Sequence, residues 1–227
     1  MTRQLSVRRF GVLFAVLSSA SFLHAGDLSK YRAFQFGMDL ASVAQAAGMR
    51  ISDAKAVHQR PALIQELSWR PERLQPALLA DTVTGVELSF YNGELFRMVV
   101  SYDRYKTRGM TTDDMVEAIS AIYGIAARPP GETAVVSALQ GNMNVVARWE
   151  DSQYLCNLLH PADEQVFYLV LSSKRLDALV GPAIVEAARI EAQEAPQKEL
   201  DLRKKQAEDL LLQIEKARLA NKATFHP

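Results

Sequence analysis

The chain has 227 residues, of which 48% are hydrophobic and 23% are charged, which is typical of a globular protein and excludes a disordered one. Its 26 Lys and Arg residues balance its 26 Asp and Glu residues, so no net field favours nucleic acid or an anionic membrane. The single cysteine, Cys156, excludes an intrachain disulfide, so stability must come from packing.

Residues 1–25 have the three-part pattern of a secretory signal peptide. Arg3, Arg8 and Arg9 precede an apolar run over 10–23, and small residues follow at a cleavage site. The run is shorter than the roughly 18 to 20 residues that cross a bilayer, so we expect cleavage rather than a retained anchor; a twin-arginine signal is the alternative. Because no cysteine stands at the cleavage site to be acylated, we expect a periplasmic or secreted protein without a stable membrane anchor.

The first half of the mature chain, residues 26–108, predicts a helix followed by antiparallel strands. Asp39 can cap the helix at its start, and Gly48 can end it in the left-handed conformation. The run over 63–69 then predicts a strand, after which prolines break the chain.

The clearest hairpin of this half lies around Asn92-Gly93. A two-residue turn there pairs Phe90 with Leu95 and places Arg97 on the apolar face. A register shifted by one residue, with Gly93 left-handed in a bulge, buries more apolar surface, so we predict it. That register places on one face Val86, Leu88, Phe90, Phe96, Met98, Val100 and Tyr102.

The second half, residues 109–180, predicts the same order of elements. Thr111 or Thr112 can cap a helix that ends at Gly124. Its apolar stripe is predicted as Met115, Ile119 and Ile122. Strands are predicted over 134–138, 145–149, 154–159 and 166–171. We therefore predict an α+β fold with helices packed on antiparallel sheet, built from a duplicated helix-plus-meander unit; the alternative to duplication is chance.

Residues 181–227 predict a helical, charged tail. Gly181-Pro182 is expected to interrupt a short helix before it, and Pro196 to kink or split the longer helix. Beyond Pro196, an apolar stripe of heptad-like spacing with Arg203 at a core position predicts a weak coiled coil. The tail thus either pairs with a partner, rests on its own domain or lies free in solution. The stripe consists of Leu200, Ala207, Leu210, Leu211, Ile214 and Ala217.

Few residues point to catalysis. Cys156 and His160 stand on one predicted strand, roughly 13 Å apart, so a buried thiol is predicted and a thiolate nucleophile is the alternative. Ser52 and Lys55 match the Ser-x-x-Lys of penicillin-recognising enzymes, but the companion motifs are missing. The histidines lack metal-ligand spacing, so we predict no catalytic, cofactor-binding or metal-binding residues and no cofactor.

Aromatic residues gather in and around the predicted strands. Any that the helices leave uncovered would form a recognition surface on the sheet; tails or loops that cover them are the alternative. They are Trp69, Tyr91, Phe96, Tyr102, Tyr105, Trp149, Tyr154, Phe167 and Tyr168.

The stretch from Gly37-Met38-Asp39 through Val43 to Gly48 resembles the Gly-Met-Thr…Val…Gly start of the small outer-membrane assembly lipoproteins. The tandem β-lactamase inhibitor proteins share their fold. The resemblance implies two helices on a three-stranded antiparallel sheet, once or twice over, and a function in binding proteins. The chain lacks the lipoproteins' acylated cysteine and the inhibitors' disulfides. We expect an envelope protein partner, bound through the sheet face or the terminal helix; a periplasmic hydrolase or small-ligand-binding protein is the alternative.

Overall fold

A computed structural model describes residues 26–71, 81–135, 142–161 and 166–224 of the chain. The predicted signal peptide lies outside the described residues. Within them, no helix combines the length and the apolar character needed to cross a membrane.

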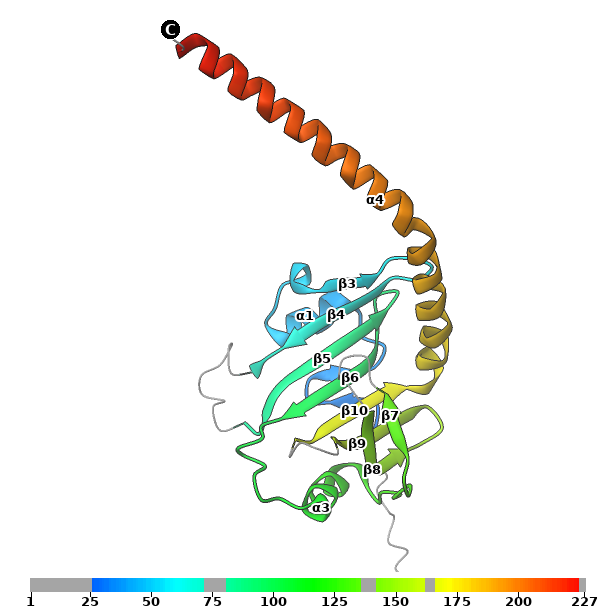
Figure 1. The fold of residues 1–227 in the computed structure, drawn as a ribbon. Helices are drawn as coiled ribbons and strands as arrows, with labels where there is room; N and C mark the ends of the chain where they lie inside the picture. Colours follow the sequence, from blue (N-terminus) through cyan, green and yellow to red (C-terminus); the bar gives the residue numbers. More distant parts are fainter. Residues whose placement is uncertain (1–25, 72–80, 136–141, 162–165, 225–227) are drawn as a thin grey trace, which may run out of the picture.

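The fold is organised around one eight-stranded antiparallel sheet (Figure 1). Its strand order is β3-β4-β5-β6-β10-β9-β8-β7, so two four-stranded meanders meet where β6 pairs with β10. A separate two-stranded ribbon precedes it, formed by β1 (Lys30–Tyr31) and β2 (Phe34–Gln35). The strands of the large sheet are β3 (Lys55–His58), β4 (Ile64–Trp69), β5 (Val83–Tyr91), β6 (Glu94–Tyr102), β7 (Thr133–Val135), β8 (Asn142–Glu150), β9 (Tyr154–Pro161) and β10 (Tyr168–Ser173).

Each half of the sheet follows a helix, as predicted, and the α+β fold class is confirmed. Helix α1 (Leu40–Ala47) begins where Asp39 accepts a hydrogen bond from the backbone N–H of Ser42, and it ends at Gly48 in the left-handed conformation. Helix α3 (Thr112–Tyr123) is capped by Thr111, which forms a reciprocal capping box with Asp114. Both helices contribute buried residues to the main core.

The predicted stripe of α3 is right in part. Met115 and Ile119 are buried, but Ile122 is 67% exposed, and Val116 and Tyr123 are buried instead. Three of the buried positions, Met115, Ile119 and Tyr123, are four residues apart, and Tyr123 also donates a hydrogen bond from its hydroxyl to the Lys30 carbonyl (3.1 Å). This contact with β1 orients the end of the helix.

The β5–β6 hairpin combines both registers that the sequence allows. Its turn is the two-residue one, with Asn92 and Gly93 both left-handed at φ values of 50° and 84°. Beside the turn, Phe90 pairs with Leu95. A bulge then shifts the register by one residue.

The predicted position of Phe96 is wrong, and the bulge is the reason. Beyond it, Leu88 pairs with Met98, as the shifted register requires. Phe96 does not share the face of Met98, because the bulge turns it to the opposite face of the sheet, where it packs with Ile64 and Leu176. An aromatic side chain thus becomes available for packing against the C-terminal helix.

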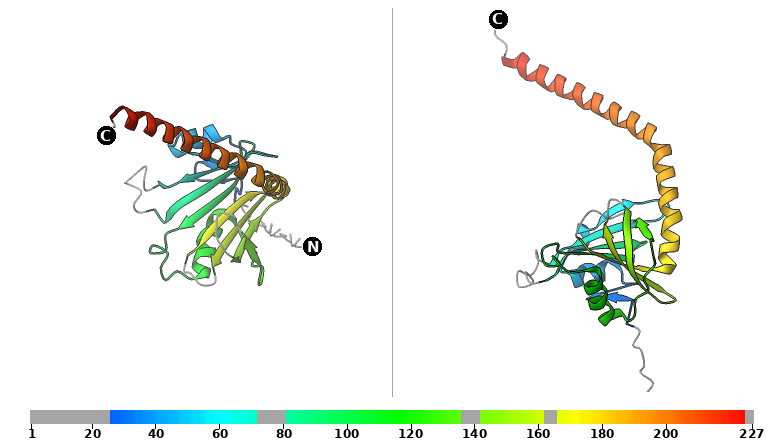
Figure 2. Two further views of the ribbon diagram at one scale, coloured as in Figure 1. Left: turned by 45° about the horizontal axis from the view of Figure 1, so that its top comes forward. Right: turned by 60° about the horizontal axis from the view of Figure 1, so that its bottom comes forward.

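Helix α4 spans Lys174–Thr224 without a break, so the predicted interruption at Gly181-Pro182 is wrong. Val180 and Ala183, on either side of that dipeptide, are both buried, and this packing holds the helix together across the proline. The helix begins within the predicted second half of the chain. It runs along the body, bends and continues beyond it (Figures 1 and 2), and a bend is expected where Pro196 removes a backbone hydrogen bond.

The two faces of the sheet are covered differently. The main core, with α1 and α3, lies on one face. On the other face, Leu176 and Val180 of α4 pack with Ile64 and Phe96. A second cluster on this face contains Val99, Met143, Val145, Leu159 and Val170, all of them buried.

Candidate functional site

The candidate nucleophile Cys156 is wholly buried, as predicted for a core thiol. Burial raises the pKa of the thiol well above its ordinary value, so the thiolate needed for attack does not form near neutral pH. His160 lies on the same strand with its ring 4.8 Å from that of Phe167. The structure therefore places Cys156 in the core and not in an open catalytic cleft.

We expect the thiol to be unreactive in the folded protein. A thiol reagent such as 5,5′-dithiobis(2-nitrobenzoate) at pH 8 should modify native Cys156 at least about 100-fold more slowly than the same chain in denaturant, because the native reaction requires opening of the core. The rates are followed by absorbance. Modification of the native protein as fast as that of the denatured chain would contradict the burial of Cys156.

Ser52 and Lys55 are not assembled into a buried site. Ser52 lies in the short 3-10 helix η1 (Ile51–Asp53), Lys55 lies on β3, and both side chains are exposed. Lys55 lies opposite Glu66 of β4, and lines a surface hollow of about 460 Å³ together with Arg50 and Arg70. Among the described residues, no group of three or more His, Cys, Asp or Glu side chains could hold a metal ion.

The aromatic side chains of the strands are mostly covered. Trp149, Phe96 and Phe167 are buried, and of the nine residues named from the sequence only Tyr105, on the loop after β6, is exposed, at 71%. The described part of the sheet therefore offers no broad aromatic surface, and more than half of the exposed large apolar side chains lie on the C-terminal helix instead.

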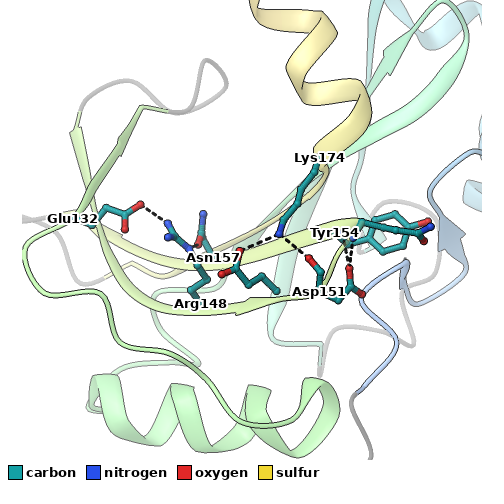
Figure 3. Close-up of polar contacts among 8 residues, drawn as sticks. Glu132, Arg148, Asp151, Tyr154, Asn157 and Lys174 are labelled. Carbon is teal, nitrogen blue, oxygen red and sulfur yellow. Dashed lines mark hydrogen bonds and ion pairs between the residues drawn. The ribbon is translucent and has the colours of Figure 1, made fainter.

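The start of α4 is fixed to the β8–β9 turn (Figure 3). The side chain of Lys174 donates hydrogen bonds to the carbonyl oxygen of Asp151 (2.6 Å) and to Oε2 of Glu150 (3.0 Å). The backbone N–H of Lys174 donates to the carbonyl of Gln153 (2.9 Å). The Asp151 carboxylate accepts from the backbone N–H groups of Gln153 and Tyr154, so the turn itself is rigidly formed.

Further ion pairs attach residues 174–195 of α4, here called the proximal segment, to the first half of the sheet. Exposed ion pairs contribute little individually, but Glu191 and Glu194 share the face of the helix that carries its buried apolar residues, and Arg175 and Asp177 flank that face on opposite sides. Hydrogen bonds from Lys198 and Arg60 hold the pKa of Glu194 below its usual value, so this carboxylate is charged at neutral pH. The pairs are Arg175 with Glu94, Asp177 with Arg97, Glu191 with His58 and Glu194 with Arg60.

Residues 197–224 of α4, here called the distal segment, have no such attachment. Every one of them is exposed. Ion pairs within the helix, such as Glu199 with Arg203 (2.6 Å) and Glu215 with Arg218 (2.7 Å), support it locally. More than half of each large apolar side chain lies in solvent, namely Leu200, Leu202, Leu210, Leu211, Leu212, Ile214 and Leu219.

The apolar stripe of the distal segment lies on a different side of α4 from the residues that pack on the sheet. With about 100° of rotation per residue, Leu200, Ala207 and Ile214 lie on one side of the helix. The buried residues of the proximal segment, such as Val180 and Ala187, lie roughly 150° further around the axis. The stripe therefore does not continue the face that packs on the sheet.

Comparisons of the chain with protein-family models, with curated proteins and with solved structures found no match. Each half contributes four strands to the sheet, one more than the three-stranded sheets that the resemblance to the assembly lipoproteins implies. That resemblance stays a prediction, and function is argued from the geometry of α4.

Proposed function

We propose that this protein is a non-catalytic, protein-binding module, exported to the periplasm by residues 1–25, and that its binding surface is the apolar stripe of the distal segment. The observation that carries the proposal is the exposure of Leu210, Leu211 and Ile214 on a helix that projects beyond the body (Figure 2). A scaffold protein of the envelope needs an apolar surface that its own domain does not cover.

The distal segment is expected to be more stable when another helix covers its apolar stripe. A helix in water gains most of its stability from packing its apolar face, and the distal segment packs on nothing within the described part of the chain. Burial of one Leu or Ile side chain stabilises a complex by about 1.5 to 3 kcal/mol. A partner helix laid along the stripe would bury several such side chains at once.

Crosslinking in the periplasm, followed by identification of the captured proteins, tests the proposal. We expect the full chain to capture a specific protein and a chain that ends at Pro196 to capture none. Leu210→Glu should abolish capture because it places a charge in the stripe. Leu212→Glu is the matched control, since Leu212 has nearly the same exposure (59% against 56%) but lies off the stripe. Equal capture by the two variants, or no capture by the full chain, would refute the proposed function.

A further inference from the structure

We propose that the distal segment is covered by the distal segment of a second copy of this chain, in a parallel two-stranded coiled coil. This inference rests on the proposed function and identifies the partner of the same stripe. It would make the protein a dimer with two bodies at one end of a shared helical stalk.

The sequence of the distal segment fits a heptad pattern, written abcdefg, in which the a and d positions form the contact between the two helices. Leu200, Ala207, Ile214 and Asn221 occupy the a positions, and Arg203, Leu210 and Ala217 the d positions. A single Asn at an a position fixes register in parallel dimers, because the two amides hydrogen-bond only to each other when the helices are aligned.

The charges beside the seam are self-complementary in the parallel arrangement. Glu199 occupies a g position and Lys204 the following e position, so each Glu199 meets Lys204 of the other helix. Arg203 donates a hydrogen bond to the same Glu199 within its own helix (2.6 Å), so in the pair each Glu199 would lie between Arg203 of its own helix and Lys204 of the other. In an antiparallel pair, the e positions share a flank and would bring Lys204 toward Arg218, which carries the same charge.

Pairing through the stripe is compatible with the attachment of the proximal segment to its own sheet in both copies. Val180 and Ala187 pack on the sheet from the side of the helix roughly opposite the stripe. Pairing through the stripe therefore does not use the residues that attach the proximal segment to the sheet. The proximal ion pairs, such as Glu194 with Arg60 (2.8 Å), can therefore be kept in both copies.

Sedimentation equilibrium of the purified, exported protein tests the pairing. We expect a monomer–dimer equilibrium, with a dimer association constant that Leu210→Glu lowers at least about 100-fold, because two buried leucines are lost at one d layer. Leu212→Glu should leave the constant unchanged within about threefold. Circular dichroism checks that both variants keep a folded body. A monomer at all concentrations up to about 0.1 mM would overturn the inference.

Disulfide trapping tests the parallel orientation, and the buried Cys156 does not interfere with it. Under mild oxidation, Ala207→Cys should crosslink to itself, since matching a positions face each other within disulfide reach. Leu212→Cys should not. Failure of Ala207→Cys to link to itself, combined with linkage between Ala207→Cys and Ala217→Cys chains, would show an antiparallel pair and overturn the inference.

The two proposals fail in different ways. One outcome is that the protein sediments as a monomer but captures a different protein, and that Leu210→Glu abolishes this capture while Leu212→Glu does not. This outcome overturns pairing with a second copy and supports the proposed function. A monomer without any stripe-dependent capture overturns both.

Discussion

Trp149→Ala is expected to lower the free energy of unfolding by about 4 kcal/mol, a large part of the 5 to 15 kcal/mol typical of a domain. Trp149 is 2% exposed and lies in the main core on β8. Its indole N–H donates a hydrogen bond to the Gly124 carbonyl (2.9 Å), which ties the end of α3 to the sheet. The substitution therefore opens a cavity and also removes the partner of a backbone carbonyl.

Urea unfolding followed by circular dichroism measures this effect. Trp149→Phe keeps most of the apolar volume but loses the donor, so we expect a smaller loss, of about 1 to 2 kcal/mol. Tyr105→Ala, at a side chain that is 71% exposed, should change stability by less than about 0.5 kcal/mol. If Trp149→Ala were no more destabilising than Tyr105→Ala, the packing of α3 on β8 would be wrong.

Val180→Asp is expected to destabilise the protein by about 3 kcal/mol or more. Val180 is 2% exposed and packs with Phe96 and Ile64 on the face of the sheet that α1 and α3 leave uncovered. A carboxylate there is buried without a partner, and it either lowers the stability of the whole domain or detaches the proximal segment. The measurement is the same urea transition.

Val185→Asp is the matched control for this prediction. Val185 lies one and a half turns further along the same helix but is 72% exposed, so the same substitution should change stability by less than about 0.5 kcal/mol. Equal effects of the two substitutions would contradict the attachment of the proximal segment to the sheet.

Local signals in the sequence predicted the helix caps and the hairpin turn, but not the short strands β1, β2 and β3. The caps of α1, Asp39 and Gly48, satisfy backbone groups within a few residues, so their role can be inferred without tertiary contacts. The hairpin turn at Asn92-Gly93 is equally local, but the bulge beside it depends on α4, which packs on Phe96 from far along the chain. No local rule could place Phe96 on that face.

The continuity of α4 depends on contacts distant in sequence. Gly181-Pro182 predicts a break because proline removes a helical hydrogen bond, and the burial of Val180 and Ala183 against the sheet offsets that cost. The hydrogen bond of His58 with Glu191 likewise joins residues that no sequence pattern connects. The apolar stripe was predicted from its periodicity; comparing its phase with the apolar positions 176, 180, 183 and 187 would have predicted that it does not continue the face that packs on the sheet.

Hydrogen exchange of α4 measured at several protein concentrations tests most directly whether the distal segment works by pairing. We expect amides of the proximal segment to be protected at every concentration, because the sheet covers them. Those of the distal segment should become protected only as concentration rises through the dimer range, and Leu210→Glu should remove that protection while Leu212→Glu keeps it. Protection of the distal segment that is independent of concentration would show that it rests on its own body, and no protection at any concentration would show that it is free; either result would contradict pairing through the stripe.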